Sequence, residues 1–121
     1  MARILIIDDD LQIRVALRHL LSSNGHDVEE AVNGEDGIVC YQEHPADLVI
    51  LDIMMPGING LEVIEILQKG FPKVRIVTLS AAHQVGRANL LPASILLGAL
   101  RAVRKPFESE YLLSVIDELL P

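Results

Sequence analysis

The sequence has one cysteine, few basic residues and no long apolar run. A single thiol excludes an internal disulfide and a cysteine-based metal cluster, and the apolar helical stretch around Cys40 predicts a small core residue. No apolar run approaches the roughly 18 residues of a membrane span, and the N-terminal residues lack the layout of a signal peptide. These absences predict a cytoplasmic protein that is not associated with a membrane.

Lysine and arginine number 10 against 17 aspartates and glutamates, which gives a formal net charge of −7. Proteins that bind nucleic acids hold the phosphates with clustered basic side chains, whereas the basic residues here are scattered. The sequence also lacks G-x-G-x-x-G, the P-loop pattern, the G-x-S-x-G elbow and any metal-ligand spacing of its four histidines. We therefore expect no direct contact with nucleic acid, no nucleotide site of these types and no serine-hydrolase chemistry.

The length of 121 residues fits a single domain, which we expect to cover residues 1–121. Apolar, β-branched runs alternate along it with stretches of helical period. The predicted strands cover residues 4–7, 26–31, 47–51, 74–79 and 100–103. The fourth helix is expected to be short, covering residues 92–97 with Pro92 first. Strands buried on both faces and joined by helices predict a doubly wound α/β sandwich of βα units around a parallel sheet.

Polar residues and glycines mark the expected ends of several helices. Asp10 and Asn59 lie where the N-caps of the first and third helices belong. Asn24-Gly25 and Gly70 lie where the same two helices should end. We therefore assign Asp10 to helix capping.

Polar residues also follow four of the predicted strands. In an open parallel sheet, ligands bind beyond the carboxyl ends of the strands, so these residues are expected to meet at one edge. Adjacent carboxylates repel one another unless a cation lies among them, and all-oxygen ligands suit Mg²⁺. Lysine and serine suit phosphate oxygens, and a carboxylate that attacks phosphorus becomes an acyl phosphate. The residues at these strand ends are Asp8, Asp9, Asp52, Ser80 and Lys105.

Each of these residues has an ordinary structural explanation when taken alone. Asp8 and Asp9 could form an acidic turn, Ser80 a turn or a cap, and Lys105 a solvated surface position. Complementary chemistry at four strand ends is much harder to explain by chance than any single residue. The joint pattern therefore predicts a magnesium site with phosphoryl chemistry.

The same residues lie in segments that resemble the receiver domain of two-component response regulators, over essentially the whole chain. In chain order the segments are ILIIDDD, LVILDIMMPGINGLEVI, RIVTLSA and KPF. The resemblance implies a flavodoxin-like fold, a three-layer sandwich whose parallel sheet has the strand order 2-1-3-4-5. It also implies phosphorelay signalling, with a sensor histidine kinase or phosphotransfer protein as the phosphodonor and a downstream protein as the partner of the output surface.

By this resemblance Asp52 is the phosphoacceptor. Mg²⁺ is held by Asp8, Asp9, Asp52 and the backbone carbonyl of Met54. The chain is expected to catalyse only its own phosphorylation and dephosphorylation, so it would not be an enzyme that turns over an external substrate. Met54 and Ala82 occupy positions that influence in the family how water reaches the acyl phosphate, and their apolar side chains predict slow self-dephosphorylation.

The residues expected to respond to phosphorylation match the family at Ser80 and Lys105 and differ from it at Ala102. The resemblance implies that Ser80 hydrogen-bonds the phosphoryl group, that Lys105 pairs with a phosphoryl oxygen, and that the bond from Lys105 to Pro106 is cis. The family usually has an aromatic residue three positions before the lysine, where this chain has Ala102. A coupled aromatic rotamer change is therefore not expected.

The output face, formed by the fourth helix, the fifth strand and the fifth helix, is where we expect this chain to differ. Leu100 and Arg101 replace an acidic pair that is common in the family, and the loop after Ser80 is long. The region also carries a set of apolar residues: Leu90, Leu91, Ile95, Leu96 and Leu97. Core packing is the favoured interpretation for most of them, and contact with a partner or a homodimer is the alternative.

Two other function classes would fit part of this pattern. A receiver-like binding module that acts without phosphorylation would fit Ala102 and the unusual output region, but the complete set of polar residues argues against it. A phosphatase with an aspartyl nucleophile would need D-x-D-x-[TV] after the first strand, which the residues from Asp8 to Gln12 do not provide. A phosphorylated signalling receiver is the leading hypothesis.

Overall fold

The computed structural model describes residues 2–81, 94, 95 and 97–120. One parallel sheet has the strand order β2-β1-β3-β4-β5. The strands are β1 (Arg3–Ile7), β2 (Asp27–Ala31), β3 (Leu48–Asp52), β4 (Ile76–Ala81) and β5 (Arg101–Lys105). The helices are α1 (Leu11–Ser23), α2 (Gly34–Glu43), α3 (Gly60–Gly70) and α5 (Ser109–Leu119). This arrangement confirms the predicted flavodoxin-like, doubly wound fold.

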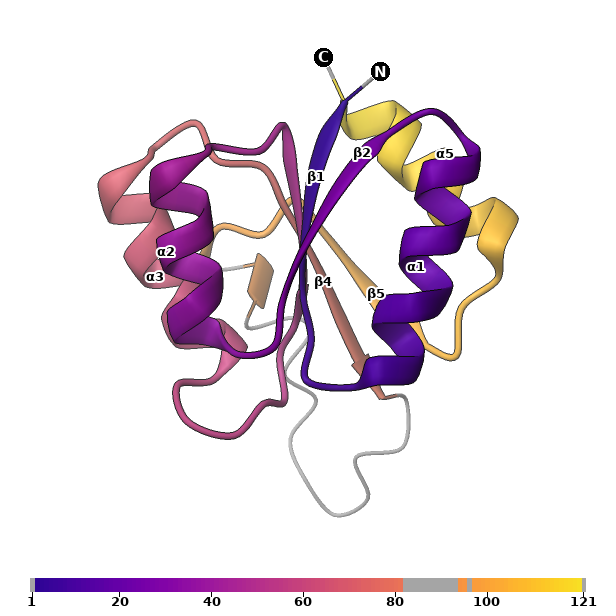
Figure 1. Cartoon of the computed structure of the whole chain (residues 1–121). Coiled ribbons are helices and arrows are strands. Elements are labelled where there is room, and N and C mark those ends of the chain that lie inside the picture. Colours follow the sequence, from indigo (N-terminus) through magenta and orange to yellow (C-terminus); the bar gives the residue numbers. More distant parts are fainter. Residues whose placement is uncertain (1, 82–93, 96, 121) are drawn as a thin grey trace.

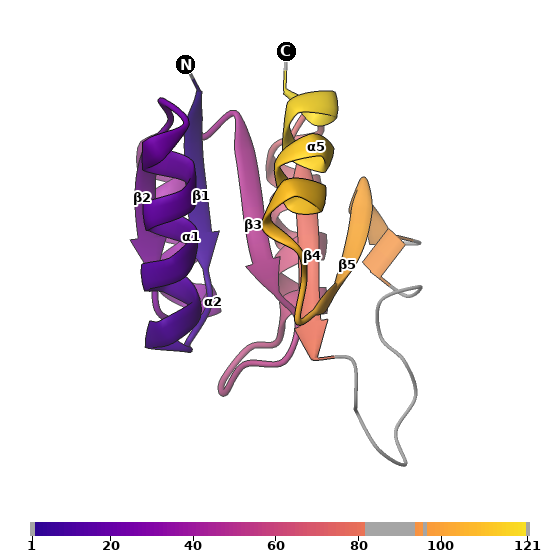
Figure 2. The ribbon, with the colours of Figure 1, turned by 90° about the vertical axis from the view of Figure 1, so that its right-hand side faces the viewer.

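The helices cover both faces of the sheet. Figure 1 shows α2 and α3 on one side of the strands and α1 and α5 on the other. Figure 2, seen at a right angle, shows that the arrowheads of the parallel strands point to the same edge of the sheet. Within the described ranges, no helix has both the length and the hydropathy that a bilayer crossing requires.

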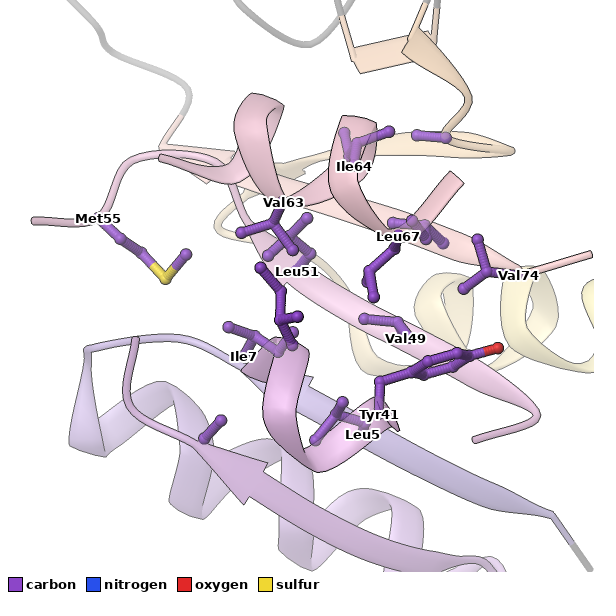
Figure 3. Packing of buried hydrophobic residues seen from close by; sticks show 14 residues of the cluster. Leu5, Ile7, Tyr41, Val49, Leu51, Met55, Val63, Ile64, Leu67 and Val74 are labelled. Carbon is purple, nitrogen blue, oxygen red and sulfur yellow. The ribbon is translucent and has the colours of Figure 1, made fainter. Parts of the chain in front are cut away.

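Two hydrophobic clusters hold these layers together. The first lies between the sheet and the helices α2 and α3, and Figure 3 shows its side chains in contact around Leu51, Val63 and Leu67. The second lies between the sheet and the helices α1 and α5. All residues of β3 are buried, which explains its continuous apolar sequence. Cys40, predicted as a core residue, is only partly buried and packs against the first cluster.

Several strands reach further toward the carboxyl edge than the sequence predicted. The register pairs Asp52 with Leu79 and Ser80 with Arg104, so the parallel ladder continues past the last apolar positions. Asp52, Ser80 and Lys105 therefore lie within the strand ends and not in the loops that follow them. The strand backbone thus fixes the directions in which these polar residues leave the sheet.

The helix caps mostly follow the prediction. Asp10 accepts hydrogen bonds from the backbone N–H groups of the first turn of α1, and Asn59 forms a capping box at the start of α3. Asn24 is the C-cap of α1. The prediction for Gly70 was wrong, because Gly70 is the last residue of α3 and Phe71 is its C-cap. The ring of Phe71 makes an edge-to-face contact with Tyr41, with ring centroids 4.9 Å apart.

The predicted fourth helix lies largely outside the described residues. Ser94, Ile95 and Leu97 are helical, whereas residues 82–93 and 96 are not described. Leu97 packs against the first cluster, and Ile95 is exposed. The predictions for Pro92, Leu90, Leu91, Leu96 and Ala82 therefore fall on undescribed positions.

Candidate functional site

Three carboxylates meet at the carboxyl edge of the sheet. Asp8 and Asp9 directly follow β1, and Asp52 ends the neighbouring strand β3. Each of the three residues offers a carboxylate oxygen, and these oxygens all lie within 4.8 Å of one another. Asp8 and Asp52 are buried, whereas Asp9 is exposed. The site is thus a small acidic pocket that opens on the side of Asp9.

Lys105 brings a positive charge into this pocket from the end of β5. Its Nζ atom lies 2.9 Å from Oδ2 of Asp8 and 3.5 Å from Oδ1 of Asp52. The side chain of Lys105 is only 16% exposed, so these ion pairs are poorly screened by water. Lys105 therefore offsets part of the repulsion between the carboxylates.

Every polar atom of Asp8 has a partner. Its backbone N–H donates to the carbonyl of Ala31 at 3.1 Å, and its backbone carbonyl accepts from Nη1 of Arg14 at 2.8 Å. Its carboxylate accepts from the backbone N–H of Asp10 and from Lys105, each at 2.9 Å. Both the backbone and the side chain of Asp8 are therefore fixed in place.

The charges of this pocket shift two ionisation equilibria. Burial, followed by the negative charge of Asp8, raises the pKa of Asp52 from 3.8 to about 7, although Lys105 and a backbone hydrogen bond from Met54 oppose the rise. Burial lowers the pKa of Lys105, but its hydrogen bond to Asp8 and the charges of Asp52 and Asp8 outweigh burial and raise it overall. Lys105 thus stays protonated, and Asp52 carries a carboxylate that gains from a nearby cation.

Ser80 and Met54 complete the set predicted from the sequence. Ser80 is buried in β4, one residue beyond the register partner of Asp52. Met54 follows Asp52 by two positions, and its side chain is 41% exposed. The peptide bond between Lys105 and Pro106 is cis, as the sequence resemblance implied. The structure thus brings Asp8, Asp9, Asp52 and Lys105 into direct proximity.

The donor set fits a hard divalent cation. All three carboxylates supply oxygen atoms, which are the ligands that such ions prefer, and their mutual repulsion falls when a cation lies among them. The raised pKa of Asp52 is the signature of that repulsion and of burial. The acidic pocket is therefore able to bind a metal ion.

Arg14 is a residue of this site that the sequence analysis missed. It lies on α1, and the sequence analysis gave it no role. The structure shows its guanidinium on the carbonyl of Asp8. A single sequence holds no spacing signal for this contact, because the contact depends on the rotation of α1 against the loop that precedes it.

Comparison with known proteins agrees with this fold and pocket. Residues 4–117 match the family model of the response regulator receiver domain, and the chain belongs to that family. The chemotaxis protein CheY of Bacillus subtilis is 34% identical over 119 residues, which cover 98% of this chain and 97% of that protein. The response regulator MprA of a Mycobacterium species, strain KMS, is 37% identical over 118 residues, which cover 98% of this chain but 50% of MprA. The chain thus spans about half the length of that relative.

Solved structures show the same architecture. The response regulator TrrA of Thermotoga maritima, solved in complex with Mg²⁺-BeF, has a TM-score of 0.86 at 37% identity, covering 99% of this chain and 100% of that one. The receiver domain of NtrX from Brucella abortus has a TM-score of 0.89 at 28% identity, with 97% of both chains covered. The fold is therefore that of CheY-like receiver domains.

Proposed function

We propose that the chain receives a phosphoryl group on Asp52 in a two-component phosphorelay and transmits the signal through a changed surface. The observation that carries this proposal is the pocket itself, in which the carboxylates of Asp8, Asp9 and Asp52 lie within 4.8 Å of one another beside the ammonium group of Lys105. A carboxylate in such a place is a nucleophile with charge-stabilising neighbours. Membership of the receiver family supports the same role.

In the proposed reaction a carboxylate oxygen of Asp52 attacks the phosphorus of a phosphohistidine. The new O–P bond forms as the P–N bond breaks, and the histidine nitrogen of the donor keeps the bonding electron pair. Lys105 would pair with a phosphoryl oxygen, and the hydroxyl of Ser80 would donate a hydrogen bond to another. Mg²⁺, held by Asp8, Asp9, Asp52 and the Met54 carbonyl, would supply the positive charge that offsets the phosphoryl oxygens.

Magnesium is proposed because its ligand preference matches the pocket. Mg²⁺ binds proteins through one or two carboxylates together with waters and phosphate oxygens, which this pocket allows. The related TrrA structure contains Mg²⁺ with BeF, which supports the same ion here. The proposal includes a cytoplasmic location and a sensor histidine kinase or phosphotransfer protein as the donor, in keeping with the family.

The output surface is proposed to lie on β5 and α5. A groove of about 420 Å³ runs along this face between the end of β5 and the first turn of α5, and its lining includes Ala102, Phe107 and Tyr111. The small side chain of Ala102 leaves this part of the face open. A downstream protein, or a second copy of the chain, would dock here, and no direct contact with nucleic acid is proposed.

The chain is proposed to act only on itself and not as an enzyme with an external substrate. The phosphorylation-independent binding module is not favoured, because such a module would not need buried carboxylates held at a cost in repulsion. The deciding experiment is intact mass measurement after incubation with acetyl phosphate and Mg²⁺. One added phosphoryl group is expected, and it should be absent with chelator and in Asp52→Asn. No adduct in the wild type, with Mg²⁺ binding confirmed, would instead favour the binding module.

Slow self-dephosphorylation is expected from the side chains around the acceptor. Met54, whose backbone hydrogen-bonds Asp52, has an exposed and apolar side chain, which cannot orient an attacking water. Met54→Asn, which supplies an amide there, should shorten the phosphoryl lifetime, whereas Val39→Asn on α2, also exposed, should leave it unchanged. Lifetimes are measured by the decay of the added mass. A wild-type lifetime of seconds would contradict the expectation.

A further inference from the structure

The partly buried guanidinium of Arg14 contacts the backbone of Asp8, the first carboxylate of the acidic pocket. Nη1 of Arg14 donates to the carbonyl of Asp8 at 2.8 Å, and Nε of the same side chain donates to Glu30 at 3.1 Å. The side chain of Arg14 is only 11% exposed. Arg14 therefore ties the loop after β1 to helix α1 and, through Glu30, to strand β2.

The contact matters because Asp8 begins the acidic loop. On its N-terminal side the loop is fixed by the hydrogen bond from the Asp8 N–H to Ala31, which neighbours Glu30 on β2. On its C-terminal side the Asp8 carbonyl has the guanidinium of Arg14 as its donor. Without that donor the peptide unit after Asp8 is held less firmly, because only the contacts of Asp8 with Ala31, Asp10 and Lys105 remain. The carboxylates of Asp8 and Asp9 are then less well ordered relative to one another.

We propose that Arg14 is a positioning residue that sets the affinity of the acidic pocket for a divalent cation. It acts through the Asp8 backbone and touches neither the cation nor the phosphoryl group. The proposal rests on the proposed function only in taking Mg²⁺ as the ion. Residues behind a ligand commonly change metal affinity by about 10- to 100-fold when they are removed, because they hold the ligand in its binding orientation.

If Coulomb forces alone acted, the replacement of Arg14 would change the cation affinity in the opposite direction. The direction of the change therefore tests the proposal. Removing a positive charge near a cation site should strengthen cation binding if only Coulomb forces act. Positioning predicts weaker binding, because the carboxylate is then less well ordered. Arg18 is a matched control, since it also pairs with Glu30 and donates to the Val28 carbonyl but has no bond to Asp8.

The experiment is a Mg²⁺ titration of the whole chain followed by amide NMR shifts. Arg14→Met should weaken Mg²⁺ binding about 10-fold, whereas Arg18→Met, with the same loss of charge, should stay within about two-fold of the wild type. Arg14→Lys keeps the charge but cannot hold Asp8 and Glu30 at once, so it should fall between the wild type and Arg14→Met. Unchanged or tighter binding in Arg14→Met, or an equal loss in Arg18→Met, would overturn the proposal. If Arg14→Met does not fold, Arg14→Lys decides, and wild-type affinity in that variant overturns the proposal.

A second readout separates this inference from the proposed function. The rate of phosphorylation by acetyl phosphate should fall in Arg14→Met at low Mg²⁺ and return toward the wild-type rate at saturating Mg²⁺. If the wild type binds Mg²⁺ but forms no adduct, the proposed function fails while the comparison of affinities still stands. If the wild type is phosphorylated and Arg14→Met needs no extra Mg²⁺, the role of Arg14 fails alone.

Discussion

As an ionised carboxylate Asp52 destabilises the fold, but it also supplies one of the three carboxylates of the acidic pocket. It ends a strand that is buried throughout, where an ionised carboxylate loses most of its hydration. Burial and Asp8 together raise the pKa of Asp52 to about 7. The free protein is therefore least stable in the charge state that the proposed chemistry requires, and a bound cation would relieve this.

Asp52→Asn should stabilise the Mg²⁺-free protein at high pH. The pKa of about 7 in the folded state lies above the ordinary 3.8, so the folded chain binds more protons than the unfolded chain between these values. The contribution of Asp52 to stability therefore falls as pH rises through this interval. We expect the advantage of Asn over Asp in the free energy of unfolding to grow by about 2 kcal/mol between roughly pH 5 and pH 8.

Urea unfolding of both proteins with chelator at the two pH values measures this difference. Asp117→Asn, at an exposed position of α5, is the control and should show no such growth. An advantage for Asp52→Asn that stays constant with pH would contradict the raised pKa.

The site residues at the strand ends were predictable from the sequence, whereas Arg14 was not. Asp8 directly follows β1, Asp52 and Lys105 are the last residues of β3 and β5, and the geometry of a parallel sheet requires such ends to meet. Arg14 contacts Asp8 across two elements, so its role depends on how α1 packs and not on any local pattern. Sequence reasoning therefore finds groups whose position the backbone dictates and misses those placed by packing.

At the scale of elements, the start of α3 is built against the end of β3. The N–H of Gly60 donates to the carbonyl of Ile53 at 2.8 Å, and Asn59 caps the helix through its box with Glu62. A Cβ atom on Gly60 would lie 2.5 Å from Cα of Ile53 and 2.7 Å from the carbonyl oxygen of Asp52. The helix can approach β3 this closely only because residue 60 has no side chain.

Gly60→Ala should therefore destabilise the fold by about 2 kcal/mol, because backbone atoms must move to admit the methyl group. It should also slow phosphorylation of Asp52, whose own carbonyl lies in the way. Gly70→Ala in the same helix is the control, since a Cβ atom there meets nothing within 4 Å. The control should change stability by no more than about 0.5 kcal/mol. Urea unfolding of both variants compares them, and equal stabilities would refute the close approach.

The predicted boundaries of helices agree with the structure where an apolar run and a capping residue coincide. Asp10 and Asn59 marked helix starts correctly, because their side chains accept hydrogen bonds from backbone N–H groups that have no partner within the helix. Strand ends were set too early, because β4 and β5 continue pairing through polar residues. Hydrophobic periodicity marks where a strand is buried, whereas hydrogen bonding decides where it ends.

For the whole molecule, the site lies at the edge of the sheet, and neither hydrophobic cluster includes its charged residues. The first cluster packs α2 and α3 on one side of the sheet, and the second packs α1 and α5 on the other, as the layers in Figure 1 show. The repulsion between the carboxylates of the acidic pocket is tolerated because the two hydrophobic clusters stabilise the fold. A ligand that binds only the folded pocket should therefore stabilise the entire fold.

Mg²⁺ should raise the melting temperature of the protein through this linkage. At a free concentration about tenfold above its Kd, a ligand specific for the folded state adds about 1.4 kcal/mol, which corresponds to a rise of about 5 °C for a chain of this size. Asp9→Asn removes one exposed carboxylate of the pocket without disturbing either core, so most of the shift should vanish in that variant. NaCl at matched ionic strength controls for screening. A shift of equal size in NaCl, or in Asp9→Asn, would mean that Mg²⁺ acts on the general charge of −7 and not on the pocket.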